Sequence, residues 1–365
     1  MTERPGFLFV TCQVGAEGAV KGELARRWGD FRFAFSRPGF LTFKLPAGHG
    51  LVGDFDLESI FAQAYGFSLG RAGGQGTDEL ARNVWQVFGD RLLRRIHVWS
   101  RLPGGAGEKS SDAPSGAVVA AARDAILARC PRPEALADDA HDSERPAQRG
   151  EFVMDCVLVE PEQWWVGYHR VGSVPSQWPG GVIPLEMPPE AVSRAWLKME
   201  EGLRWSQLPV GPGARVAEIG SAPGGASQAL LGRGLEVTGI DPAAMDPAVL
   251  EHPRFRHIRR RAIAVRRRDF RKIRWLAADM NVAPKYTLDV LESIVRHPTV
   301  SIRGMLITLK LIEWPMVEHL PECLRRIRSW GYNEVRARHL VHNRHEVCVA
   351  ALARPFVRKR SLRRR

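Results

Sequence analysis

The sequence predicts an α/β domain with a mostly parallel sheet in its C-terminal half, preceded by two smaller α+β units. From Arg215 onward, short apolar segments alternate with helical ones, which is typical of a parallel sheet. Before Ser173, each unit has several predicted strands and only one predicted helix. The segment 173–189 has five prolines and separates the two patterns.

The first unit is expected to span residues 1–75. Residues 7–12 (FLFVTC) predict a strand, and residues 16–28 have Ala19, Leu24 and Trp28 at helical spacing. Residues 31–35 and 39–45 alternate in polarity around Ser36-Arg37-Pro38 and predict a hairpin.

The second unit is expected to span residues 76–172. It contains a predicted strand at 95–99, a helix at 117–130 and a hairpin at 152–158 and 164–169. Residues 102–116 are rich in Gly, Ser and Pro and predict a loop. Residues 131–150 have little apolar content and predict a mobile loop, and residues 173–190 a linker.

The third unit is expected at residues 191–354, followed by a basic tail at 355–365. Its predicted strands are 215–219, 236–240, 275–278, 304–309 and 346–352, and its predicted helices are 191–203, 226–231, 288–296 and 316–330. No segment approaches the roughly 20 apolar residues that a membrane helix needs, so a cytoplasmic protein without a membrane partner is expected. The five cysteines contain no C-x-x-C pair, which argues against disulfides and a structural zinc site.

Positive charge is concentrated locally. The net charge is +13, yet residues 251–274 carry 11 Lys or Arg against 2 acids, and residues 354–365 carry 7 against none. Such a field favours a polyanion such as RNA, while a solvated arginine-rich surface is the alternative. Four aromatic residues are candidates for stacking on bases or, alternatively, for a hydrophobic core: Trp164, Trp165, Tyr168 and Trp178.

A glycine-rich turn is the first candidate binding site. Residues 215–225 (RVAEIGSAPGG) predict a strand, a turn and the start of a helix, which suits a nucleotide-like ligand. A second predicted strand ends at Asp241, and an acid there commonly binds a ribose diol. Pro223 argues against a dinucleotide, because it removes a donor from the turn. A tight turn without a ligand remains the alternative.

The turn SAPGGASQ resembles the cofactor turn of the FtsJ-like ribose 2′-O-methyltransferases. Four further strings match motifs of that family in order: SRAWLKME at 193–200, ADMNVAP at 278–284, LITLKL at 306–311 and RHEVCV at 344–349. The resemblance implies a Rossmann-like class I methyltransferase domain that uses S-adenosylmethionine and requires no metal. The implied cofactor-binding residues are Gly220, Ser221, Ala222, Pro223, Gly224, Gly225, Asp241 and Asp279.

The resemblance also implies a catalytic tetrad of Lys198, Asp279, Lys310 and Glu346. Lys310 would be the general base toward a ribose 2′-hydroxyl, and Lys198 would lower its pKa, because a neighbouring cation disfavours a second ammonium. The two acids would position the lysines, although ionised acids nearby oppose that lowering of the pKa. Taken singly, each of the four residues is also explained as a surface charge or a helix cap.

A narrower resemblance, based on MEEGLRW at 199–205 and ARHLVHNRHEV at 337–347, is to the bacterial ribosomal RNA large subunit methyltransferase M group. It implies ferredoxin-like and THUMP-like units before the catalytic domain, and a cytidine of 23S rRNA as the target. One departure is at Ala262, where relatives have an acid that contacts adenine; Asp269 is a possible substitute with different spacing. Two alternatives remain: methylation of another acceptor, and a catalytically silent RNA-binding protein.

Overall fold

The computed structural model describes residues 5–101, 116–142 and 144–353 and divides into two compact units, residues 1–184 and 185–365. The boundary falls inside the expected linker. The expected basic tail, and nearly all of the loop expected at 102–116, lie outside the described residues.

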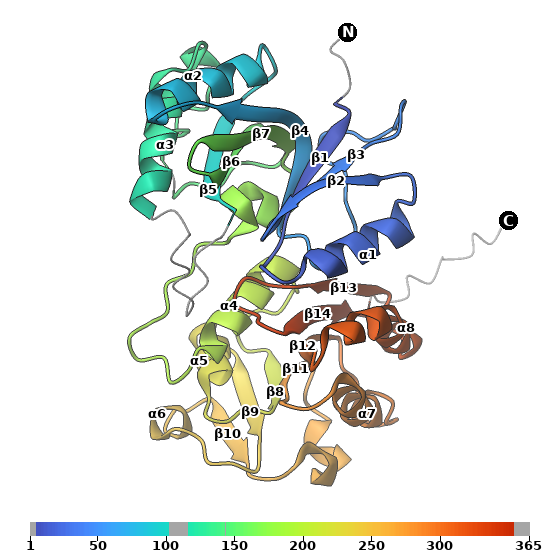
Figure 1. Cartoon of the computed structure of the whole chain (residues 1–365). Coiled ribbons are helices and arrows are strands. Elements are labelled where there is room, and N and C mark those ends of the chain that lie inside the picture. The colour runs from blue at the N-terminus through green and yellow to red at the C-terminus, as the bar shows by residue number, and fades with distance from the viewer. Residues whose placement is uncertain (1–4, 102–115, 143, 354–365) are drawn as a thin grey trace, which may run out of the picture. The chain divides into compact units, whose positions relative to one another are not determined.

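The first unit is built on one seven-stranded sheet with the order β2-β3-β1-β4-β7-β6-β5 (Figure 1). The strands are β1 (Phe7–Thr11), β2 (Arg32–Arg37), β3 (Phe40–Lys44), β4 (Ala64–Gly73), β5 (Arg95–Ser100), β6 (Phe152–Glu160) and β7 (Gln163–Arg170). The sequence did not predict β4, which pairs with β1 on one side and β7 on the other. One sheet therefore joins the strands before residue 75 to those after it. The division into two units at residue 75, and their assignment as ferredoxin-like and THUMP-like, stay predictions.

Helices complete the first unit. They are α1 (Glu17–Arg27), α2 (Thr77–Phe88) and α3 (Gly116–Ala128), of which α2 was not predicted. Trp164 belongs to the core beneath α2 and α3, and Trp165 packs with Phe40 in a second cluster. These two tryptophans are only 4% and 7% exposed, so the alternative of a hydrophobic core is confirmed for them and base stacking is excluded.

Part of the segment expected to be a mobile loop belongs to the core of the first unit. Residues 131–150 contain the short 3-10 helix η1 (Pro133–Ala135). Leu136 and Ala140 follow it and are buried in the same cluster as Trp164. The prediction of a mobile loop from low apolar content is therefore wrong for this part of the segment, because a few apolar side chains are enough to fix it to the sheet.

The second unit has a seven-stranded sheet with the order β10-β9-β8-β11-β12-β14-β13. The strands are β8 (Arg215–Ile219), β9 (Glu236–Ile240), β10 (Phe255–Ile258), β11 (Trp275–Asp279), β12 (Gly304–Lys310), β13 (Glu334–Arg338) and β14 (Glu346–Leu352). The first five are parallel, and β14 is antiparallel to both of its neighbours. The sequence predicted all except the edge strands β10 and β13.

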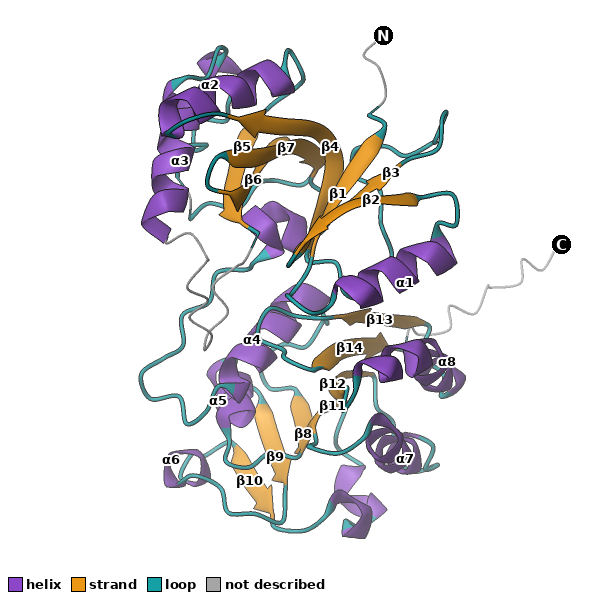
Figure 2. Cartoon of the chain, in the orientation of Figure 1, coloured by secondary structure: helices purple, strands orange, loops and turns teal. Residues whose placement is uncertain are grey.

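Helices cover both faces of the second sheet (Figure 2). They are α4 (Ala195–Ser206), α5 (Gly225–Gly232), α6 (Pro247–Leu250), α7 (Pro284–Val295) and α8 (Leu320–Ser329). Burial on both faces explains why β8, β11 and β12 read as continuous apolar runs. No helix within the described ranges is both long and apolar enough to cross a membrane.

Candidate active site

Strand register places three charged side chains on one face of the second sheet. Asp279 ends β11 and lies beside Thr308 of β12, and Lys310 lies two residues further along β12. Lys310 is the direct partner of Glu346 in the antiparallel ladder between β12 and β14. Residues directly opposed in a ladder share a face, so Asp279, Lys310 and Glu346 point to the same side.

Helix α4 brings the fourth side chain to this face. Gly202 lies one turn after Lys198, and a Cβ at Gly202 would lie 2.9 Å from Leu306 Cδ2 and 3.3 Å from Cys348 Sγ. The missing side chain therefore lets α4 approach β12 and β14 closely. The sequence-predicted tetrad is thus brought together from one helix and three adjacent strands.

The four groups alternate in charge around a closed arrangement. Lys198 Nζ lies 3.4 Å from Asp279 Oδ2, and Lys310 Nζ lies 3.4 Å from Asp279 Oδ1. Both ammonium groups also contact Glu346, Lys198 through Oε1 and Lys310 through Oε2. Glu346 is the most buried of the four, with 4% of its side chain exposed against 20–23% for the others. Two cations and two carboxylates leave the cluster neutral.

The cluster alters the pKa of two of its members. Burial raises the pKa of Glu346, but Lys198 and Lys310 outweigh it and hold that pKa below its usual range. Burial lowers the pKa of Lys310, but Asp279 and Glu346 outweigh it and raise that pKa above its usual value. The sequence left open whether the pKa of Lys310 is lowered or held up by the two acids, and in this arrangement the two carboxylates dominate over burial.

A buried loop that sequence reasoning did not single out fixes Glu346. Asn343 donates from Nδ2 to Glu346 Oε1 over 3.2 Å and accepts at Oδ1 from the Leu340 backbone N–H over 3.1 Å. Glu201, on α4, accepts the backbone N–H groups of Val341 and His342 at 2.8 and 2.9 Å. Helix α4 therefore presents Lys198 and anchors the loop before Glu346. The strings MEEGLRW at 199–205 and ARHLVHNRHEV at 337–347 contain Glu201 and Asn343, but they carried only the narrower resemblance and assigned neither residue a role.

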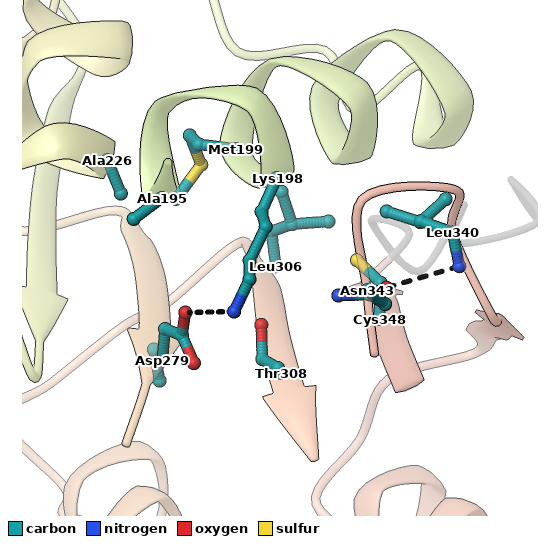
Figure 3. A pocket seen from close by; sticks show the side chains of 11 residues that line it. Ala195, Lys198, Met199, Ala226, Asp279, Leu306, Thr308, Leu340, Asn343 and Cys348 are labelled. Atoms are coloured by element: carbon teal, nitrogen blue, oxygen red, sulfur yellow. Dashed lines mark hydrogen bonds and ion pairs between the residues drawn. The ribbon is translucent and has the colours of Figure 1, made fainter. Parts of the chain in front are cut away.

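A pocket opens beside the tetrad, under α4 (Figure 3). In the close-up, Lys198 reaches from α4 toward Asp279 at the end of β11, with Thr308 beside them. Asn343 and Leu340 lie across the pocket on the loop before β14. The lining residues are Ala195, Lys198, Met199, Ala226, Ala278, Asp279, Leu306, Thr308, Leu340, Asn343 and Cys348.

The glycine-rich turn joins β8 to α5 next to this pocket. Gly220 has φ +80°, and a Cβ there would lie 2.6 Å from the Asp279 carbonyl oxygen. A Cβ at Gly225 would lie 2.7 Å from the carbonyl oxygen of Ser193. These two positions require glycine because backbone from β11 and from the segment before α4 passes directly against the turn. Asp241, directly after β9, accepts the N–H of Ala222 at 3.2 Å and that of Ala243 at 2.8 Å.

The other residues of the turn differ in burial and in what they contact. The side chain of Ser221 is buried and directed at Met245, 3.5 Å from its sulfur, so only its backbone faces the turn. Pro223 is exposed and Ala222 half-buried. At Gly224 a Cβ would lie 2.6 Å from Val249 Cγ2.

The turn suits a ligand that has an anionic group, a cationic group and a diol. Ser193 Oγ is buried without a hydrogen-bond partner, while Asp279 Oδ1 has the contact to Lys310 Nζ at 3.4 Å, and both residues border the turn. The start of α5 offers backbone N–H groups to an anion, and Asp241 is an acceptor for hydroxyl groups. The donor set therefore fits S-adenosylmethionine, which has a carboxylate, an ammonium group and a ribose.

The segment after β10, where relatives have an acid that contacts adenine, has no acid near Ala262 in the sequence. Ala262 is buried in the short 3-10 helix η4 (Ala262–Ala264), four residues after β10 ends. Residues 252–268 contain no acid, and Asp269 lies further along in the 3-10 helix η5 (Arg267–Phe270). No carboxylate from residues 252–268 therefore lies beside Ala262.

A second buried polar cluster lies in the first unit. His97, Asp155 and His169 have potential ligand atoms within 4.8 Å of one another. Both ring nitrogens of His169 are already engaged, Nδ1 with Asp155 Oδ2 at 2.7 Å and Nε2 with the Ser176 carbonyl oxygen at 2.8 Å. Burial lowers the pKa of His169, but Asp155 and the Ser176 carbonyl outweigh it and raise that pKa above its usual value. Burial also raises the pKa of Asp155, so the contacts and not a charge state describe this pair. Through the Ser176 carbonyl oxygen it holds residues 175–177 to the sheet.

Comparisons with known proteins bear on the second unit. Residues 191–306 match the family described as FtsJ-like methyltransferase, a range that includes Lys198 and Asp279 and ends before Lys310. The ribosomal RNA large subunit methyltransferase M of Thauera aminoaromatica is 29% identical over 215 residues, covering 56% of this chain and 57% of that protein. The protein of the same name from Halorhodospira halophila is 33% identical over 178 residues, covering 48% and 51%.

The chain thus spans about half the length of the curated relatives it matches. Among solved structures, TrmN from Thermus thermophilus is 15% identical, with a TM-score of 0.34 over 95% of this chain and 99% of TrmN.

Proposed function

Because the second unit carries an FtsJ-like methyltransferase domain, we propose that this chain methylates the ribose 2′-hydroxyl of an RNA nucleotide with S-adenosylmethionine as donor. The mixed sheet with antiparallel β14 is an α/β class I methyltransferase fold. The observation that carries the proposal is the neutral cluster of Lys198, Asp279, Lys310 and Glu346 next to the glycine-rich turn. The names of the curated relatives support large-subunit ribosomal RNA as the substrate. A cytidine of 23S rRNA as the target is what the narrower family resemblance implies.

The turn would hold the cofactor and the tetrad would act on the acceptor. S-adenosylmethionine supplies an electrophilic methyl group on a sulfonium. The start of α5 and Ser193 would bind its carboxylate, Asp279 its ammonium group and Asp241 its ribose diol. These residues would orient the donor for in-line attack by the acceptor hydroxyl.

Lys310 would accept the proton of the 2′-hydroxyl. A ribose hydroxyl is a weak nucleophile at neutral pH and needs a base close to it as it attacks. Lys310 must first lose its own proton, although Asp279 and Glu346 hold its pKa high. We propose that Asp279 interacts with the positively charged donor in the working complex, which weakens its hold on Lys310. Lys198 stays beside Glu346, and its positive charge favours the neutral form of Lys310.

The experiment uses the full chain with methyl-labelled S-adenosylmethionine and an unmodified transcript of large-subunit rRNA. Label should appear on a ribose 2′-oxygen; label on a base or on protein would refute the ribose assignment. Lys310→Ala should keep cofactor affinity, measured by calorimetry, and lose turnover by at least about 100-fold, the usual lower bound for a general base.

The Lys310→Arg variant distinguishes between two roles of Lys310, a general base and a structural positive charge. Arginine keeps the positive charge between Asp279 and Glu346 but cannot be deprotonated in a protein. The arginine variant should therefore be as inactive as Lys310→Ala. If it restores turnover, Lys310 acts only as a charge, and the general-base role is wrong.

A further inference from the structure

A strongly cationic surface lies on the second unit, outside the tetrad and the turn. We call it the arginine face and define it as the ten exposed cations between residues 254 and 274: Arg254, Arg256, Arg259, Arg260, Arg261, Arg266, Arg268, Arg271, Lys272 and Arg274. It covers the edge strand β10 and the segment with η4 and η5 that leads to β11. Its ten cations lie close together in the chain, from the residue before the edge strand β10 to the residue before β11.

The cations of the arginine face lack the carboxylate partners that some other arginines of the unit have. Arg215 pairs with Glu236 at 2.7 Å, and Arg233 pairs with Glu200 at 2.7 Å. Within the described part of the chain, none of the ten forms an ion pair within 4.0 Å. A surface that leaves this many like charges uncompensated repels itself, so it is suited to an external polyanion.

The hydrogen bonds of the arginine face leave its guanidinium groups available. Arg254 donates to the Gly234 carbonyl oxygen at 3.2 Å, and Arg274 donates to that of Ser301 at 3.1 Å. These contacts orient the side chains without neutralising them. A guanidinium has five donors in a planar fork that matches a phosphate, so an arginine that uses one of them on a carbonyl oxygen can still bind a phosphate with the others.

The arginine face is continuous with the cofactor turn. Arg259 donates from Nε to the Pro242 carbonyl oxygen at 3.3 Å, one residue after Asp241. His257, between two of the exposed arginines, contacts the Asp241 carbonyl oxygen through Nε2 at 3.0 Å. A polyanion bound here therefore begins at the edge of the candidate active site.

The apolar content of this surface favours a nucleic acid over a lipid membrane. Membrane-surface elements combine basic residues with a face of large apolar side chains. Here Phe270 is 1% exposed and Phe255 is half-buried, which leaves Ile263, at 67%, as the exposed large apolar side chain of residues 254–274.

We infer that the arginine face binds the phosphate backbone of the RNA substrate and positions it at the candidate active site. This inference rests on the proposed RNA methyltransferase function. It assigns the face no role in reading bases, because phosphate contacts fix the register of an RNA without specifying its sequence.

The test removes three charges from the full chain with Arg260→Gln, Arg261→Gln and Arg268→Gln together. Binding to the unmodified rRNA transcript is measured by filter retention over a series of salt concentrations. Each lost phosphate contact lowers the slope of log K against log salt by about 0.7 to 0.9. The triple variant should therefore show a slope shallower by about 2 and an affinity at low salt weaker by at least about tenfold.

A matched control removes three charges from another surface of the same unit, with Arg204→Gln, Arg325→Gln and Arg328→Gln on α4 and α8. The control should keep the slope and affinity of the parent, and the terminal basic segment is unchanged in both variants. Cofactor affinity and the unfolding midpoint should match the parent in both triple variants, which excludes misfolding as the cause. Equal losses in the two variants, or an unchanged slope in the first, would overturn the inference.

Two further outcomes separate this inference from the proposed function. If the slope falls as expected but the parent transfers no methyl group to RNA, the arginine face stands and the proposed function is wrong. If the parent methylates RNA and the first triple variant binds it unchanged, the function stands and the arginine face is wrong. Binding of the parent to phosphatidylserine vesicles through these arginines, with RNA binding unaffected, would also overturn the inference.

Discussion

Glu218 should make the stability of the second unit depend on pH in an unusual direction. It lies on the central strand β8 with 2% of its surface exposed, and its carboxyl group accepts a hydrogen bond from Ser227. Burial, aided by the charges of Asp279 and Asp241 and opposed by the Ser227 bond, raises its pKa from 4.5 to about 8. The folded protein therefore keeps this proton at neutral pH, while the unfolded chain loses it.

The magnitude follows from the two pKa values. Below 4.5, Glu218 is protonated in both states and its full contribution to stability is present. Between 4.5 and about 8, folding takes up a proton, so stability falls as pH rises through this range. Each pH unit costs about 1.4 kcal/mol, so raising the pH from about 5.5 to about 8 should cost on the order of 3 kcal/mol.

Glu218→Gln removes this titration and keeps a carbonyl oxygen for Ser227. The free energy of unfolding is measured for the parent and the variant in urea at the two pH values, by circular dichroism. The gain of the variant over the parent should be larger at the higher pH by about 3 kcal/mol. Glu236→Gln, at a 47% exposed side chain on β9, is the control and should show no such change. A difference between Glu218→Gln and the parent that is equal at both pH values would refute the reasoning.

Two predictions concern the residues around the turn and Glu346. Asn343→Ala should lower turnover by about tenfold, the equivalent of one hydrogen bond to Glu346. Asn343→Asp adds a negative charge beside Glu346, which should move the acid limb of the pH profile of kcat to higher pH. Unchanged pH profiles for both variants would contradict a positioning role for Asn343. Gly220→Ala should destabilise the second unit by about 1–3 kcal/mol and weaken cofactor binding, because its Cβ would meet the Asp279 carbonyl oxygen at 2.6 Å and its φ is +80°. Gly211→Ala, where a Cβ meets nothing within 4 Å, should do neither, as urea unfolding and calorimetry can check.

The sequence predicted the central strands better than the edges. Strands β8, β11 and β12 are buried on both faces, so their apolar runs are plain in the sequence. Edge strand β10 is only four residues long (FRHI) and has Arg256 and His257 at its centre, which hides its pairing with β9. Such a strand is specified by its neighbour rather than by its own composition, so local patterns miss it.

The candidate site divides in the same way. Ordered motifs and a family resemblance identified the tetrad and the turn, because those residues form short strings. Glu201 and Asn343 were missed, since their partners are the backbone of residues 340–342 and one carboxylate, which no spacing reveals. The direction of the Lys310 pKa shift could not be predicted from the sequence either, because it depends on whether burial or two carboxylates dominate at that atom.

The ladder between β12 and β14 has a consequence for how this unit can change. Lys310 and Glu346 are opposed in that ladder, although 35 residues separate them in the chain. Their distance is therefore set by hydrogen bonding between two strands and not by the length of what connects them. Insertions or deletions near Gly331, between α8 and β13, would leave the pair in register, whereas a one-residue slip of β14 would turn Glu346 to the opposite face. The segment between α8 and β13 is thus a place where a relative or a designer can add a recognition element without disturbing the ion pair between Lys310 and Glu346.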